Sequence, residues 1–95
     1  MRRDRGVTGA EGGLTGWEQI RIALRTIVDK GGVATIEDIY NAVEIELGQR
    51  LSFQGRSSLR HFVNKTAVDA GYIEPHSPTR PGWRPTLSGR HYAGR

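Results

Sequence analysis

The sequence predicts one α+β domain, built from three helices and a small antiparallel β-sheet. Three stretches repeat apolar residues at the three-and-four spacing of a helix, and the first two open with the capping-box pattern, a threonine followed three residues later by an acid. Two short apolar stretches then flank a proline- and glycine-rich segment, which is typical of a β-hairpin. The 95 residues suffice for one modest core. We expect the domain over residues 15–88, a disordered basic tail over 1–14 and a C-terminal tail over 89–95.

The first helix is expected to begin at Thr15, because its hydroxyl and the Glu18 carboxylate can each accept a backbone N–H at the helix start. Its inward stripe follows at helical spacing: Trp17, Ile20, Leu24, Ile27 and Val28. Residues 31–32, both glycine, end it. Residues 33–34 are too few for an independent element, so we expect a strand that pairs with a distant segment.

The second helix is expected from Thr35, with Asp38 completing its capping box, to Gly48. Its inward stripe is Ile36, Ile39, Tyr40, Val43 and Leu47. The remaining surface is acidic, with four carboxylates and no Lys or Arg between residues 36 and 48. In the connector that follows, Leu51 and Phe53 are predicted to be apolar anchors.

The third helix is predicted over residues 54–70, and Gly71 ends it. With Leu59 placed inward, the same face carries Phe62, Val63, Thr66, Ala67 and Ala70. The opposite, outward face carries Gln54, Ser57, His61, Asn64 and Val68. Arg60 and Lys65 lie on the flanks of the helix.

The hairpin is predicted from two strands, residues 72–74 and 83–87. Between them, Pro81-Gly82 suits the central pair of a type II turn, since proline fixes φ and glycine accepts a positive φ. We expect the early strand at residues 33–34 to join this hairpin in one sheet. Trp83 is predicted to cover the core, with a DNA-contacting ring as the alternative.

Charge is distributed unevenly along the chain. Residues 1–48 carry a net charge of −2 and residues 49–95 a net charge of +6, and residues 49–68 hold four basic side chains and no acid. We therefore expect one positive face turned away from one negative face. A positive face on a small protein favours a polyanionic partner, of which nucleic acid is the commonest. The alternative is a compositional bias toward Arg and Gly without functional meaning.

The predicted order of elements resembles the winged helix-turn-helix superfamily, three helices with a small antiparallel sheet whose hairpin is the wing. The stretches that carry the resemblance are the basic helix at 55–65, the passage from Ala70 to Ile73 and the returning strand at 82–87. The pattern is similar to the globular domain of linker histones and to small winged helices of bacterial restriction and chromatin-type proteins. These three stretches do not choose among those relatives.

The resemblance implies binding of double-stranded DNA, with the third helix in the major groove and the wing on the neighbouring backbone. The side chains that would face base edges are Ser57, Arg60, His61 and Asn64, and Gln54 is a further residue expected to contact DNA. Those that would contact phosphate from the helix region are Arg50, Arg56 and Lys65. Arg80 and Arg84 would contact phosphate from the wing, with His76 and Thr79 as weaker candidates.

Catalysis and metal binding find little support. Ser57 and His61 are one helical turn apart, but Asp69 is three turns from Ser57 on the same helix, so no relay can form. The three histidines are scattered and the chain has no cysteine, so neither a metal site nor a disulfide is expected. No glycine-rich phosphate loop occurs. We expect no enzyme activity and no cofactor.

Two other functions stay open. The domain could be a protein-interaction or dimerisation module that uses the acidic second helix or Val68, or the DNA-reading subunit of a larger nuclease or regulatory system. RNA is disfavoured, because the sequence offers little sign of an exposed aromatic platform. No apolar run approaches the roughly 20 residues of a membrane span. We expect a cytoplasmic, nucleoid-associated protein without a membrane partner.

Overall fold

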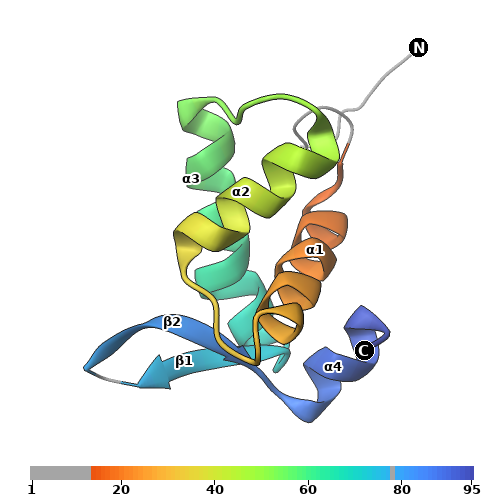
Figure 1. Ribbon diagram of the computed structural model, residues 1–95, viewed down its shortest axis with the longest axis vertical. Helices are drawn as coiled ribbons and strands as arrows, with labels where there is room; N and C mark the ends of the chain where they lie inside the picture. Colours follow the sequence, from red (N-terminus) through yellow and green to blue (C-terminus); the bar gives the residue numbers. More distant parts are fainter. Residues whose placement is uncertain (1–13, 78) are drawn as a thin grey trace.

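Four α-helices and one antiparallel pair of β-strands make up the part of the chain that the structure, a computed structural model, describes: residues 14–77 and 79–95 (Figure 1). The elements are, in order, α1 (Gly16–Asp29), α2 (Ile36–Leu47), α3 (Phe53–His61), a π-helical segment η1 (Phe62–Ala67) that continues α3, β1 (Ile73–Ser77), β2 (Arg80–Pro85) and α4 (Leu87–Ala93). The predicted α+β class is confirmed. Residues 1–13 of the predicted N-terminal tail lie outside the described residues, as does the side chain of Arg80.

Both predicted capping boxes are present. At the start of α1, the Glu18 amide donates to Thr15 Oγ1 (3.1 Å) and the Thr15 amide donates to Glu18 Oε1 (2.7 Å). At the start of α2, the Asp38 amide donates to Thr35 Oγ1 (3.3 Å) and the Thr35 amide donates to Asp38 Oδ2 (3.0 Å). Such caps stabilise a helix by about 1 kcal/mol each, because they satisfy amides that have no partner within the helix.

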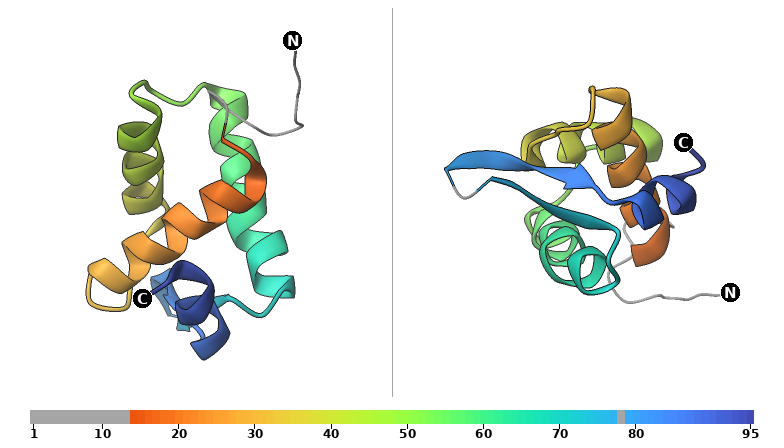
Figure 2. Two further views of the ribbon diagram at one scale, coloured as in Figure 1. Left: turned by 90° about the vertical axis from the view of Figure 1, so that its right-hand side faces the viewer. Right: turned by 90° about the horizontal axis from the view of Figure 1, so that it is seen from below.

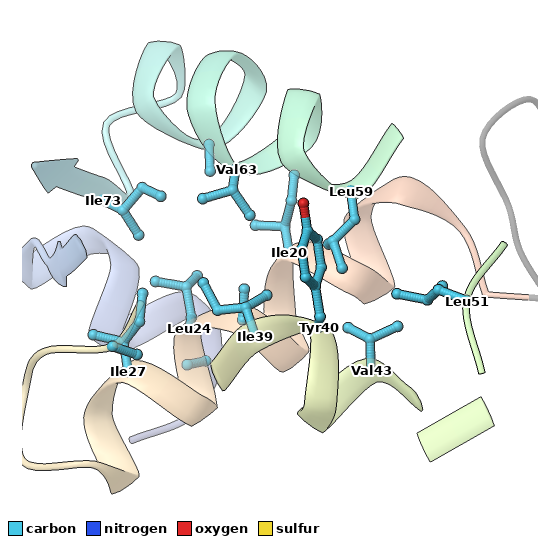
Figure 3. Close-up of a cluster of buried hydrophobic side chains, with 14 residues drawn as sticks. Ile20, Leu24, Ile27, Ile39, Tyr40, Val43, Leu51, Leu59, Val63 and Ile73 are labelled. Carbon is cyan, nitrogen blue, oxygen red and sulfur yellow. The ribbon is translucent and has the colours of Figure 1, made fainter. Parts of the chain in front are cut away.

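The core lies where α1, α2 and the continuous segment α3–η1 meet (Figure 3). Ile73, the first residue of β1, closes one face of it. Most of the predicted inward residues are buried in it: Ile20, Leu24, Ile27, Ile39, Tyr40, Val43, Leu51, Leu59, Val63 and Ala67. Three of the predicted inward or anchoring residues are exposed instead: Trp17, Phe53 and Ala70. Trp17 is 47% exposed. It lies at the surface, where it packs edge-on against the rings of Tyr72 and Tyr92. Phe53 is 85% exposed and anchors nothing.

The third helix is continuous but not uniform, and the difference changes which way its end faces. Hydrogen bonding in a π-helix spans five residues, so η1 inserts one extra residue and turns everything after it by about 100°. Val68, predicted to face outward, is half-buried and packs against the core. Ala70, predicted to face inward, is exposed. The π-helical segment therefore removes Val68 from the outward surface.

The hairpin turns at a different place from the one predicted. Strands β1 and β2 pair antiparallel from Ile73↔Pro85 to Ser77↔Arg80, so the chain reverses between residues 77 and 80 and Pro81-Gly82 lies inside β2. The strand predicted at residues 33–34 is a single β-bridge between Ala34 and Trp83. The backbone amide of Trp83 donates to Ala34 O (2.8 Å), and the amide of Ala34 donates to Trp83 O (3.2 Å). Gly82, at φ +118°, passes close to the Ala34 carbonyl, where a larger residue would crowd. Trp83 is half-buried against the core, as predicted.

Residues 87–93 form helix α4, where the sequence predicted the end of a strand at residue 87 and a tail from residue 89. Thr86 caps α4, and the side chain of Arg25 in α1 donates from Nε to Ala93 O (2.9 Å). Arg95 donates from Nε and Nη2 to the Asp29 carboxylate (3.0 and 3.1 Å). The chain end is thus fastened to α1, while the hairpin extends from another side of the molecule (Figure 2).

Candidate nucleic-acid interface

The side of α3 and η1 that faces away from the core is polar and exposed. We call the side chains of this surface the outer face: Gln54, Ser57, Arg60, His61 and Asn64. All five are exposed, so the predicted outward surface is confirmed except for Val68. Within the described residues, Gln54, Ser57 and Asn64 make no side-chain hydrogen bond. Their donors and acceptors are available to a partner.

Arg60 is held in place by a neutral neighbour. Its Nε donates to the hydroxyl of Tyr40 (3.3 Å), a residue of α2 that is 5% exposed. That hydrogen bond is the largest cause of a pKa of Arg60 above its usual value, and the negative charge of Glu37 adds to it. A guanidinium has five N–H donors, and the bond to Tyr40 uses only the one on Nε. The terminal nitrogens of an oriented arginine are therefore left for a ligand.

A cleft of about 230 Å³ opens beside Arg60. Three elements contribute to it, the start of α2, the outer face and strand β2. Its lining residues are Thr35, Ile36, Arg60, Asn64, Pro81, Gly82 and Trp83. Arg60 is the one charged group among them, so the cleft is cationic. The fold thus brings together the two outer-face residues best suited to base recognition and the hairpin strand.

The predicted phosphate contacts are less free than the outer face. Arg56 lies with its guanidinium 4.9 Å from the centre of the Tyr40 ring and 3.4 Å from Glu44 Oε2. The Leu51 amide donates to the same Glu44 oxygen (2.9 Å), and this bond, followed by that from Arg56, lowers the pKa of Glu44. Arg56 is therefore folded against α2.

Two further cations also pair with acids. Lys65 Nζ lies 3.0 Å from Asp69, one turn along the helix, and Arg84 Nε lies 2.9 Å from Glu74 across the hairpin. The expectation of a positive face turned away from the carboxylates is therefore wrong for Arg56, Lys65 and Arg84. The sequence offered the hint, since charges four residues apart on a helix, or opposite in a hairpin, tend to meet.

The remaining predicted contacts differ among themselves. Arg50 is exposed and, within the described residues, forms no ion pair, although its charge adds to the lowering of the pKa of Glu44. The side chain of Arg80 lies outside the described residues. His76 is half-buried, and its Nδ1 has no hydrogen-bond partner in the part of the chain that the structure describes. The amide of Thr79 donates to Ser77 Oγ (3.1 Å) at the hairpin turn.

Other chemistries gain nothing from the geometry of residues 14–77 and 79–95. No group of three His, Cys, Asp or Glu side chains in this part of the chain could hold a metal ion. Ser57 and His61 are both exposed, and no hydrogen bond joins their side chains. None of the described helices has the length and apolar character that crossing a membrane requires.

Two features of the site were missed at the level of sequence. The role of Tyr40 could not be found, because its spacing marks it only as a core residue. The outward position of Phe53 could have been found: counted back from Leu59 at 100° per residue, it falls on the side of Arg60.

Comparison with known proteins returned no match: no protein-family model, no curated protein and no solved structure matches this chain. Function is therefore inferred from the geometry and charge of the site.

Proposed function

We propose that this chain is a winged-helix protein that binds double-stranded DNA, with the outer face in the major groove and the β1–β2 hairpin on the adjoining backbone. The observation that carries the proposal is the cleft beside Arg60. An oriented arginine, an asparagine that makes no side-chain hydrogen bond among the described residues, and the hairpin strand line it together. The element order, with β1 and β2 directly after the third helix, supports the winged-helix assignment.

The two polar residues of the cleft match the groups that a major groove presents. Arginine can donate two hydrogen bonds to guanine O6 and N7, and asparagine can pair with adenine N6 and N7. Arg60 and Asn64 are four residues apart, which is about 6 Å along a helix, or roughly two base-pair steps of 3.4 Å. Each bidentate contact discriminates against the wrong base by about 1–3 kcal/mol.

The ion pairs on the cations set how strongly the protein grips phosphate. Exposed pairs contribute only about 0–1 kcal/mol, so Lys65 and Arg84 can exchange a carboxylate for a phosphate at small cost. Arg56 is the worst placed, since Glu44 also holds the Leu51 amide. With Arg50, Lys65 and Arg84 as contacts, the log–log salt slope is about −2.7, at −0.9 per contact. Adding Arg56 and Arg80 brings it to about −4.5.

The test is binding to a short random duplex at several salt concentrations, measured by fluorescence anisotropy. Arg60→Ala with Lys65→Ala should abolish binding, since the pair removes the cleft cation and a phosphate contact. The matched control is Arg21→Ala with Arg90→Ala, which removes the same charge from α1 and α4, away from the outer face. If both double variants weaken binding equally, only net charge matters and the proposed site is wrong.

A protein-docking module is the second candidate, and it has one observation in its favour. Ile45 on α2 is 81% exposed and Phe53 is 85% exposed, and exposed apolar residues are common in interfaces. Val68 no longer supports this function, because it packs against the core. Docking is the better explanation if the Arg60/Lys65 variant leaves duplex affinity unchanged while a protein partner is lost.

A further inference from the structure

Phe53 is exposed at the first position of α3, directly after the N-cap Ser52. A single exposed apolar side chain carries little information by itself, because much of any protein surface is apolar. What distinguishes Phe53 is where it lies on its helix. The first turn of α3 holds no acidic residue, and Arg50 and Arg56 lie three residues to either side.

The position of Phe53 continues the outer face toward the start of the helix. Within α3, Phe53, Ser57 and Arg60 follow one another at spacings of four and three, which places them along one side. Asn64, in η1, lines the same cleft as Arg60. All four are exposed. Phe53 and Arg60 are seven residues apart within α3, about 10 Å along the axis, or roughly three base-pair steps.

The surroundings of this ring fit a duplex better than a protein groove. An apolar groove would have to desolvate Arg50, which has no ion pair among residues 14–77 and 79–95. A duplex offers both kinds of contact close together, since an apolar group on a base edge lies in the groove and the phosphates border it. The major groove carries one apolar group, the C5 methyl of thymine, and phenylalanine is among the side chains that contact it.

We propose that Phe53 contacts the thymine methyl group of an A·T pair about three steps from the pair read by Arg60. This inference rests on the proposed DNA binding and specifies what the start of α3 recognises. Gln54 is the next residue and is exposed, and glutamine can pair with adenine N6 and N7. An apolar ring and an amide at adjacent positions therefore suit the two halves of one or two neighbouring A·T pairs.

The test uses two duplexes of identical A·T-rich sequence, one with thymidine and one with deoxyuridine, which lacks only the methyl group. Wild-type affinity should fall about fourfold for each methyl contacted, the value expected for one buried methyl group. The Phe53→Ala variant should bind both duplexes equally. Ile45→Ala is the matched control, because it removes an equally exposed apolar side chain from α2 and should keep the wild-type difference.

The outcomes separate this inference from the proposal on which it rests. Duplex binding that is insensitive to deoxyuridine overturns the role of Phe53 but leaves DNA binding intact, whereas absence of duplex binding overturns both. An equal loss in wild type and Phe53→Ala would mean that deoxyuridine acts through the shape of the duplex. The same methyl occurs on 5-methylcytosine, so a second pair compares it with cytosine. A gain there, without a loss on deoxyuridine, overturns the assignment to thymine.

Discussion

Tyr40→Phe tests whether the hydroxyl beneath Arg60 prepares that side chain for DNA. The substitution removes one oxygen, keeps the ring in the core and keeps the Arg56 guanidinium over its face. Arg60 then loses its bond at Nε and has to be ordered when DNA binds. Ordering a long side chain costs about 0.5–1.5 kcal/mol, which corresponds to a loss in affinity of about twofold to tenfold.

The assay is a double-mutant cycle on duplex affinity. Wild type, Tyr40→Phe, Arg60→Ala and the combined variant are titrated at one salt concentration that keeps the weakest of them measurable. Tyr40→Phe should weaken binding in the wild-type background and have no effect when Arg60 is already alanine, because the hydroxyl acts through that guanidinium alone. Thermal unfolding serves as the control. The free energy of unfolding of Tyr40→Phe should differ from that of the wild type by less than about 1 kcal/mol, since the Arg60 side chain that loses the bond stays exposed to water.

Two results would refute this reasoning. If Tyr40→Phe weakens binding equally in both backgrounds, the hydroxyl acts through packing or through Arg56, not through Arg60. If it strengthens binding, the hydrogen bond holds Arg60 in an arrangement that the duplex has to break. The second result would place Arg60 with Arg56, as a cation withdrawn from the partner by α2.

Two further predictions concern stability. The hydrogen bond from the Leu51 amide holds the pKa of Glu44 below its usual value. The contribution of Glu44 to stability is therefore present above the pKa of the unfolded chain and lost as pH falls through the folded-state pKa, so acid unfolding of Glu44→Gln should be less steep than that of the wild type. An unchanged acid limb would mean that the Leu51 and Arg56 contacts do not stabilise the fold. Gly82→Ala should destabilise by about 1–3 kcal/mol in chemical unfolding, since it combines a positive φ with crowding against Ala34 O. Gly31→Ala is its control, because Gly31 also has a positive φ (+89°) but has open space around it. If both variants lose equal stability, the close approach of Gly82 to Ala34 O contributes nothing.

Much of the fold could be predicted because its signals are local. Thr15 and Thr35 each have an acid three residues later, and the bonds that form a capping box lie within that interval. The burial of Leu59 follows from helical periodicity in the same way. Even the pairing of residue 34 was foreseen, because two residues cannot form a strand by themselves.

The failures arise where geometry depends on distant parts of the chain. The π-helical segment has no local sequence signal, yet it turns the helix end and moves Val68 from the surface to a half-buried position against the core. The end at residues 87–93 reads as a tail because its helix is short, and the contacts that hold it come from Arg25 and Asp29. The hairpin turn was misplaced because Pro81-Gly82 is a good turn pair, whereas in the fold Gly82 is needed beside Ala34.

In the candidate site, too, the local features could be predicted from the sequence and the long-range contacts could not. The difference affects which residues we expect to contribute affinity and which to contribute specificity. Net charge predicted a cationic surface, but it could not predict that Arg56, Lys65 and Arg84 each pair with a carboxylate. A phosphate has to compete with those acids, so these three cations give less affinity than their number suggests, and salt weakens both competing interactions. Arg60 is different, since the group that orients it is a neutral hydroxyl. Tyr40 holds that side chain without neutralising it, which is the condition for a cation that selects a base as well as attracting a phosphate. Under the proposed DNA binding, we expect the ordered Arg60 and the exposed polar residues beside it to determine sequence preference, and the paired cations to keep nonspecific affinity low.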